Sequence, residues 1–108
     1  MNIANWLHDT QRREPQRPAL FEGTRQIADY ATFAAHVRQR AAYLVDQHGV
    51  TTGDAVAVLM KNSCDYLELL YAIWWVGAVV VPINAKLHPS EAAWIADDAQ
   101  ARLIFTDG

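Results

Sequence analysis

The sequence has few of the residues that commonly build metal sites, phosphate loops and nucleic-acid surfaces. It has one cysteine, Cys64, which excludes an intrachain disulfide and a cysteine-rich zinc site. Its five glycines, at positions 23, 49, 53, 77 and 108, match neither G-x-G-x-x-G nor G-x-x-x-x-G-K-S/T, which excludes a glycine-rich phosphate-binding loop. The basic residues Arg12, Arg13 and Arg17 are interrupted by Glu14 and by prolines, and the net charge is -3. We therefore predict a solvated turn at this basic cluster and no nucleic-acid partner.

The sequence also lacks a hydrophobic run that is well suited to a bilayer. Residues 1–9 contain neither the basic region nor the apolar region of a secretory signal. Residues 66–83 are apolar over about the length of a membrane span, but Glu68 lies inside this run and Gly77 divides it. The β-branched residues 79–81, followed by a proline, are typical of a buried strand. We predict no membrane span, and we expect a cytoplasmic location because nothing indicates an oxidising compartment.

The composition is typical of one small globular domain. The 108 residues are 52% hydrophobic and 19% charged, with acidic and basic side chains interspersed. A chain of this length has room for one modest core and not for two. We therefore predict a single domain that covers residues 1–108.

The first half of the sequence predicts a helix, a β-hairpin and a second helix. Apolar residues recur at helical intervals over residues 3–13, and two short runs able to pair, 19–22 and 25–28, flank a glycine turn. A second helix follows, with its apolar stripe at positions 33, 37, 41 and 44. Capping residues mark the helix limits: Asn2 or Asn5 at the start of the first helix, and Asp29 and Gly49 at the two ends of the second.

The second half predicts strands that alternate with helices. The expected strands are residues 55–60, 79–81 and 102–106. The expected helices are residues 64–76, capped by Asn62 or Ser63, and residues 91–100, capped by Ser90. The order β-α-β-α-β predicts an α/β fold with a small parallel doubly wound sheet.

The helix at residues 64–76 indicates that further protein surrounds this domain. It has almost no polar face, and a three-stranded parallel sheet leaves its edges open. We therefore expect the chain to be a piece of a longer polypeptide. We also expect the isolated chain to self-associate, because Trp74 and Trp75 lose the cover that the rest of the protein would give.

No side chains with an evident chemical role stand at a suitable spacing. Four histidines far apart in the sequence are interpreted as surface or turn residues: His8, His36, His48 and His88. Cys64 is interpreted as a small buried apolar residue, because no histidine is placed to act as its base. Asp65 and Glu68 are interpreted as residues of a solvated face near a helix start. The aromatic residues from position 66 to 75 are interpreted as core. We assign no catalytic, cofactor-binding or metal-binding residue.

Several spaced motifs are nevertheless characteristic. Residues 17–20 read R-P-A-L, residues 29–33 read D-Y-A-T-F, and residues 49–57 read G-V-T-T-G-D-A-V-A. Residues 72–84 read A-I-W-W-V-G-A-V-V-V-P-I-N, and Glu91 follows. Together these motifs resemble the opening of the adenylate-forming (AMP-binding) superfamily, which includes acyl-CoA synthetases, aryl-CoA ligases, luciferases and adenylation domains. Asp29 and Thr32, Cys64 and the bulky pair at positions 74 and 75 depart from its usual pattern and leave the subfamily open.

The resemblance implies a two-step reaction that uses ATP, Mg²⁺ and CoA. A carboxylate attacks ATP to give an acyl-adenylate and pyrophosphate, and the CoA thiol then displaces AMP. The resemblance implies that the phosphate-binding loop, the ribose-binding aspartate and the late lysine lie beyond residue 108, so none is assigned to this chain. Pro82-Ile83-Asn84 is interpreted as structural.

The leading interpretation is the amino-terminal part of a fatty-acid or related carboxylic acid–CoA ligase, inactive by itself, whose partner is the rest of the parent enzyme. An aryl-acid–CoA ligase and an adenylation domain that loads a carrier protein are alternatives. A self-associating α/β interaction module, which uses the apolar face from Leu67 to Val76, is an alternative of another class.

Overall fold

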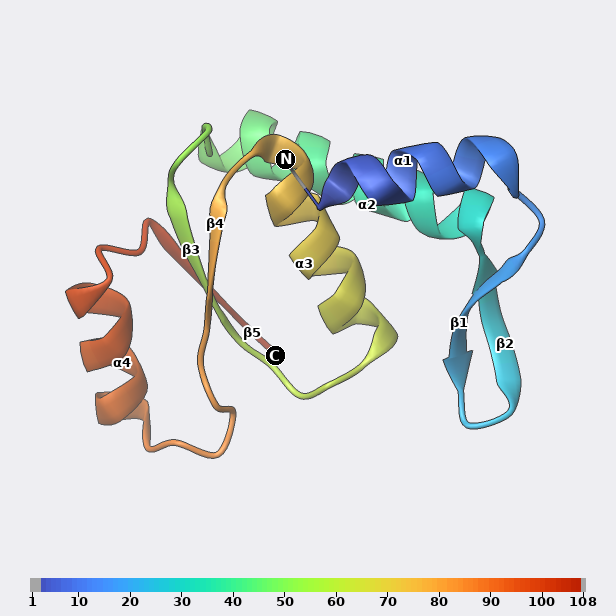
Figure 1. Cartoon of the computed structure of the whole chain (residues 1–108). Coiled ribbons are helices and arrows are strands. Elements are labelled where there is room, and N and C mark those ends of the chain that lie inside the picture. The colour runs from blue at the N-terminus through green and yellow to red at the C-terminus, as the bar shows by residue number, and fades with distance from the viewer. Residues whose placement is uncertain (1–2, 108) are drawn as a thin grey trace.

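A three-stranded parallel sheet with the strand order β4-β3-β5 lies at the centre of the fold (Figure 1). The structure is a computed structural model that describes residues 3–107. The central strand β3 (Ala55–Leu59) pairs with β4 (Val79–Pro82) on one side and with β5 (Leu103–Thr106) on the other. The predicted parallel doubly wound sheet is confirmed.

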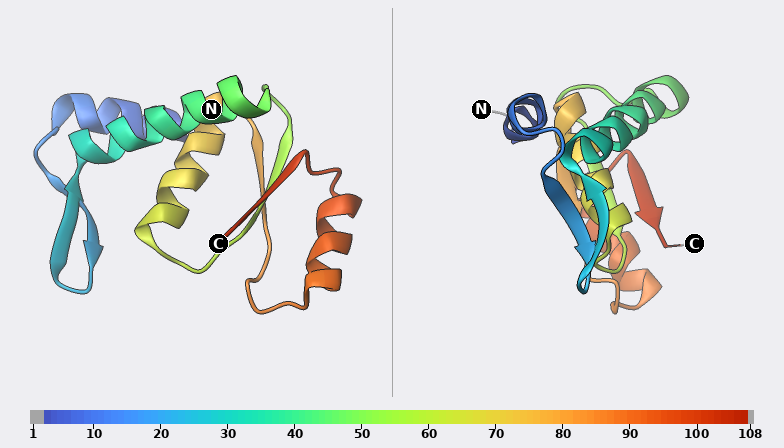
Figure 2. Two further views of the ribbon diagram at one scale, coloured as in Figure 1. Left: turned by 180° about the vertical axis from the view of Figure 1, so that it is seen from behind. Right: turned by 90° about the vertical axis from the view of Figure 1, so that its right-hand side faces the viewer.

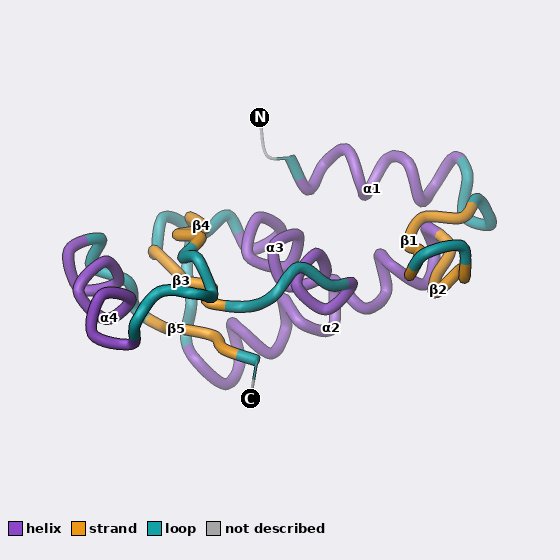
Figure 3. The backbone as a smooth tube through the Cα atoms, turned by 90° about the horizontal axis from the view of Figure 1, so that it is seen from below, coloured by secondary structure: helices purple, strands orange, loops and turns teal. Residues whose placement is uncertain are grey.

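The two faces of the sheet are covered by different helices. On β3, Val56 and Val58 point into a core shared with α2 (Tyr30–His48) and α3 (Cys64–Val76). The alternate residue Ala57 packs instead with α4 (Pro89–Asp98). Because successive side chains of a strand point to opposite faces, an entirely apolar strand such as β3 has to be covered on both. Figure 3 shows the strands between α4 and the helix pair.

The amino-terminal elements lie on the far side of α3 from the sheet (Figure 2). Helix α1 (Ala4–Arg13) packs on α2 and α3 and buries Leu7 completely. Strands β1 (Pro18–Glu22) and β2 (Arg25–Asp29) form the predicted antiparallel hairpin. The turn between them is tight because Gly23 adopts a positive φ of 61°.

Helix α2 begins and ends at the predicted residues. The Asp29 carboxylate accepts a hydrogen bond of 2.8 Å from the amide of Thr32, which satisfies one of the free amides at the helix start. Gly49 ends the helix in the left-handed conformation. The predicted apolar stripe is buried, and it consists of Phe33, Val37, Ala41 and Leu44.

Helix α3 also has its predicted limits. Ser63 caps it by accepting a hydrogen bond from the amide of Tyr66, and Gly77 ends it in the left-handed conformation. Trp74 and Trp75 are half-buried by the elements of this chain, as expected for core residues that are only partly covered. None of the helices in residues 3–107 combines the length and the apolar character needed to cross a bilayer.

Two predicted capping residues, Asn5 and Ser90, are wrong. Asn5 lies inside α1, whose capping position is Ile3, and the alternative Asn2 lies outside the described residues. Helix α4 begins at Pro89, and the capping side chain is His88, which accepts from the amide of Ser90 at 3.1 Å. Helix α4 begins earlier than predicted because proline suits the first helical position, where its missing amide hydrogen costs nothing.

Candidate functional site

The carboxyl ends of the parallel strands form the edge of the sheet where a doubly wound fold places its ligands. Strand β3 connects to β4 on one side, and the chain then returns to form β5 on the other side of β3. The strand order therefore reverses beside β3. Ligands of open α/β sheets bind outside the carboxyl ends of the strands at such a point. We call this edge, at the bottom of the sheet in Figure 1, the carboxyl edge.

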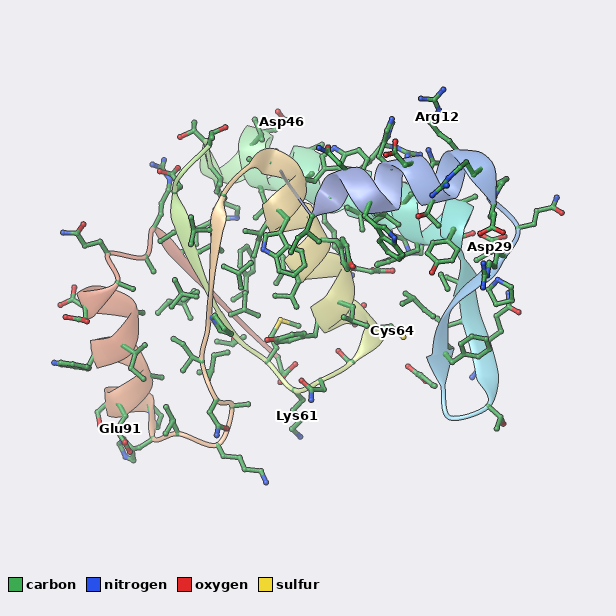
Figure 4. The ribbon with its side chains drawn as sticks, in the orientation of Figure 1. Arg12, Asp29, Asp46, Lys61, Cys64 and Glu91 are labelled. Atoms are coloured by element: carbon green, nitrogen blue, oxygen red, sulfur yellow. The ribbon has the colours of Figure 1, made fainter. Side chains whose placement is uncertain are left out.

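A cavity of about 500 Å³ lies at the carboxyl edge. Its walls are the turn after β3, the turn after β4 and the first part of α3. The lining combines two lysines and two asparagines with apolar side chains: Met60, Lys61, Asn62, Tyr66, Pro82, Ile83, Asn84, Ala85 and Lys86. Figure 4 shows Lys61 in the turn that follows β3. A hollow of this size and mixed character suits part of a small-molecule site.

Hydrogen bonds fix the turns of the carboxyl edge. The amide of Lys61 donates to the carboxylate of Asp107 at 2.8 Å, which joins the ends of β3 and β5. The side-chain oxygen of Asn84 accepts from the amide of Lys86 at 2.9 Å, and Ile83 donates to the carbonyl of Val58 at 2.9 Å. The Asn84 side chain thus stabilises its own turn, as asparagine often does. This contact gives a physical account of the Pro-Ile-Asn motif.

The motif at residues 49–57 lies at the opposite edge of the sheet. Within it, the Asp54 carboxylate accepts hydrogen bonds from the amide and the hydroxyl of Thr51, at 2.8 and 3.2 Å. The bond from the Thr51 amide holds the pKa of Asp54 below its ordinary value, and Arg102, 3.9 Å away, contributes less. The motif therefore builds a rigid turn before β3, away from the cavity.

A cluster of charged side chains joins α2 to α3. The buried carboxylate of Glu68 lies 2.7 Å from Nδ1 of His36 and 3.0 Å from Nε of Arg40. Arg40 also donates to Asp65 at 3.0 Å. The prediction of a solvated Glu68 is therefore wrong, whereas His36 is a surface residue as predicted and reaches Glu68 from its exposed position. The available signal was a carboxylate flanked by leucines in a helix with almost no polar face, because a buried charge needs a partner.

This cluster forms one wall of a second cavity, of about 430 Å³, beside the hairpin. Cys64 also lines it and is half-buried, at the start of α3 (Figure 4). Burial raises the pKa of the Cys64 thiol, and the carboxylates of Glu22, Glu68 and Asp65 raise it further. The surroundings of Cys64 therefore do not favour a reactive thiolate.

The remaining histidines do not gather at one place. His48 lies 3.1 Å from the hydroxyl of Tyr43, His88 caps α4, and the ring of His8 packs against Trp75. Within residues 3–107, no group of three histidine, cysteine, aspartate or glutamate side chains is arranged to hold a metal ion. We assign the Mg²⁺ that accompanies ATP to none of these described residues.

Known proteins match this chain over nearly its whole length. Residues 7–108 match the family model described as AMP-binding enzyme. The chain is 37% identical over 107 residues to a 2-succinylbenzoate–CoA ligase of Geobacillus kaustophilus (strain HTA426), in an alignment that covers 97% of this chain and 21% of the relative. The corresponding ligase of Bacillus anthracis (strain A0248) is 42% identical over 108 residues, with the same coverage. The chain thus spans 21% of the length of these curated relatives.

Solved structures agree with this match. The N-terminal domain of FACL13 from Mycobacterium tuberculosis has a TM-score of 0.88 and 31% identity, over 98% of this chain and 27% of that chain. The N-terminal subdomain of NpsA from Klebsiella oxytoca, in complex with 3-hydroxyanthranilyl-AMSN, has a TM-score of 0.90 and 26% identity, over 99% of this chain and 27% of that chain. The resemblance drawn from the sequence motifs is confirmed, and the chain belongs to the AMP-binding, adenylate-forming enzyme family.

Proposed function

We propose that this chain forms the first α/β subdomain of an ATP-dependent carboxylic acid–CoA ligase that acts through an acyl-adenylate. The observation that carries the proposal is the family match over residues 7–108. It is supported by the close agreement with an N-terminal subdomain of NpsA, at a TM-score of 0.90. The chain contributes the carboxyl edge and its cavity, and the reacting groups belong to the rest of the enzyme.

The acid that we propose carries an aromatic ring. The relatives that support this are named 2-succinylbenzoate–CoA ligases and are 37% and 42% identical to the chain. A structure named fatty acyl CoA synthetase from Mycobacterium tuberculosis is 31% identical. These identities favour the aryl-acid alternative over the fatty-acid ligase that the sequence motifs first suggested.

ATP, Mg²⁺ and CoA are proposed as the other reactants of the complete enzyme. The first step places negative charge on the phosphates, so it needs cations and preorganised donors around them. The second step needs access for the CoA thiol, which enzymes commonly arrange by a movement between domains. The described part of the chain offers rigid walls for such a site, and we derive no step of the reaction through it.

The test is an acid panel on the complete polypeptide that contains this chain. Pyrophosphate release is measured with ATP and Mg²⁺ for 2-succinylbenzoate, benzoate and a series of fatty acids, with and without CoA. We expect release that depends on the aromatic acid, and a thioester product only when CoA is present. Release with fatty acids alone would overturn the aryl assignment, and a folded enzyme that releases pyrophosphate with no acid would overturn the proposed function.

A further inference from the structure

Four polar side chains join α2 to the first two turns of α3. His36 and Arg40 stand one turn apart on α2, and they face Asp65 and Glu68 on α3. The guanidinium of Arg40 lies 3.0 Å from a carboxylate oxygen of each acidic residue. Residues four apart on one helix share a face, as do residues three apart, so the two pairs meet across the helix interface. We call these four residues the interhelix clamp.

Glu68 restricts how α2 and α3 can be placed at the interhelix clamp, because its buried carboxylate needs both partners. Its side chain is 7% exposed, and each of its two oxygens has a partner: Oε1 accepts from Arg40 and Oε2 lies against His36. A buried carboxylate is tolerated only where partners satisfy it, because leaving it unpaired in a poorly solvated site is costly. The start of α3 is therefore held where α2 supplies both partners.

The other end of α3 is fastened in a different way. The amide of Gly53 donates to the carbonyl of Gly77 at 2.9 Å, and the hydroxyl of Thr52 lies 3.3 Å from the carbonyl of Val76. Backbone geometry thus fixes the carboxyl end of the helix to the turn before β3. The amino end is attached through side chains instead, by the clamp and by Cys64 and Tyr66, which pack against the core.

The start of α3 leads directly into the carboxyl edge. Lys61 and Asn62 line the cavity there, Ser63 caps the helix, and Tyr66 lines the same cavity. We infer that the interhelix clamp is a positioning device that sets the start of α3, and with it the Lys61–Asn62 wall of the candidate site. The inference rests on the proposed function only in calling this wall part of a site.

Amide hydrogen exchange in the described chain tests the positioning directly. The probes at the start of α3 are the amides of Tyr66 and Leu67, which bond to Ser63. The reference amide at the other end is that of Gly53, which bonds to Gly77. In Arg40→Met we expect exchange at the two probes to accelerate about tenfold, while exchange at Gly53 stays unchanged, because only the clamped end is released.

Matched variants separate positioning from general loss of stability. Arg38→Met removes an arginine from the exposed face of the same helix, and we expect it to leave both ends unchanged. Arg40→Lys keeps the charge but not the forked geometry. We expect it to accelerate exchange at Tyr66 and Leu67 less than Arg40→Met does and to leave Gly53 unchanged. This variant also serves as the test if Arg40→Met does not fold. Equal acceleration at both ends of α3, or no acceleration at its start, would overturn the inference.

A kinetic measurement links the clamp to the site. In the complete polypeptide, Asp65→Asn removes one exposed arm of the clamp and leaves the pair of Arg40 and Glu68 intact. We measure KM for the acid, ATP and CoA. We expect this variant to raise at least one of these KM values about two- to fivefold with little change in kcat, because the cavity wall at the start of α3 is displaced and the reacting groups are not. An unchanged KM would overturn the link to the site. If the unmodified enzyme acts on no acid, the proposed function fails while the exchange experiment still decides the clamp.

Discussion

The backbones of Gly53 and Gly77 meet through a hydrogen bond of 2.9 Å, which joins the turn before β3 to the end of α3. Both residues have a positive φ, of 87° and 88°. They belong to two separate sequence motifs, and the left-handed conformation of each residue explains why glycine stands there. The contact fixes the amino edge of the sheet, where α3 leads into β4.

Alanine at position 77 should cost more stability than alanine at position 53. Both replacements force a β-carbon into the left-handed region, at about 1–2 kcal/mol. A β-carbon at Gly53 meets nothing within 4 Å, whereas one at Gly77 meets Oγ1 of Thr52 at 3.1 Å. We therefore expect Gly77→Ala to lose about 1 kcal/mol more than Gly53→Ala in urea unfolding. Equal losses would show that the crowding at Thr52 is relieved without cost.

Two carboxylates that accept hydrogen bonds from backbone amides should make the chain less stable in acid. The Thr32 amide holds the pKa of Asp29 below its ordinary value, and the Thr51 amide does the same for Asp54. A group whose folded pKa is depressed stabilises the fold above its unfolded pKa, about 3.9, and that stability is lost as pH falls through the folded pKa. We expect stability to decline below about pH 4.

The variants Asp29→Asn and Asp54→Asn should each flatten the acid limb of that profile, because the group that takes up a proton is gone. Asp46→Asn, which changes an exposed carboxylate on α2, is the control for the removal of one negative charge. Urea unfolding midpoints at a series of acidic pH values make the comparison. A profile of Asp29→Asn with the same slope as the unmodified chain would contradict the assignment.

Cys64 should react slowly with alkylating reagents. Burial and the nearby carboxylates of Glu22, Glu68 and Asp65 raise the pKa of its thiol, so less thiolate is present at neutral pH than for an ordinary cysteine. We expect iodoacetamide to modify the folded chain more slowly than the urea-unfolded chain. Asp65→Asn should speed the folded reaction, and an unchanged rate in that variant would contradict the electrostatic part of the explanation.

The isolated chain should self-associate, although through other residues than the sequence suggested. Trp94 on α4 is 68% exposed, Val79 on β4 is 52% exposed and Ile104 on β5 is 46% exposed. These side chains lie on the elements that flank the open sheet, and exposed apolar surface of this kind favours association. We expect sedimentation to show a mass that rises with concentration, and Trp94→Gln to weaken the rise. A strictly monomeric mass at high concentration would contradict this prediction.

The fold was largely predictable from local signals. The caps Asp29 and Ser63 and the terminal glycines at 49 and 77 act on their own helices, so neighbouring residues in the sequence reveal them. The parallel sheet followed from the alternation of apolar strands with capped helices. The start of α4 was missed because Ser90 is the more common capping residue, while Pro89 indicated a helix that begins earlier.

The charged contacts could not be predicted from sequence spacing. His36 and Glu68 are 32 residues apart, and Arg40 and Glu68 are 28 apart, so only the packing of α2 on α3 brings them together. The cavity at the carboxyl edge has the same origin, because its walls come from two turns that follow different strands. The family could be recognised without these contacts. Its motifs determine turns, and they do not include the charged residues between α2 and α3.

The most direct test of the account is a replacement of the equivalent segment in the 2-succinylbenzoate–CoA ligase of Geobacillus kaustophilus by this chain, which is 37% identical to it. Pyrophosphate release with 2-succinylbenzoate is measured for the chimera and for the isolated chain, after circular dichroism has shown that both are folded. The account predicts release by the chimera within about tenfold of the parent ligase, and no release by the isolated chain. A folded chimera without activity, or release by the isolated chain, would contradict it.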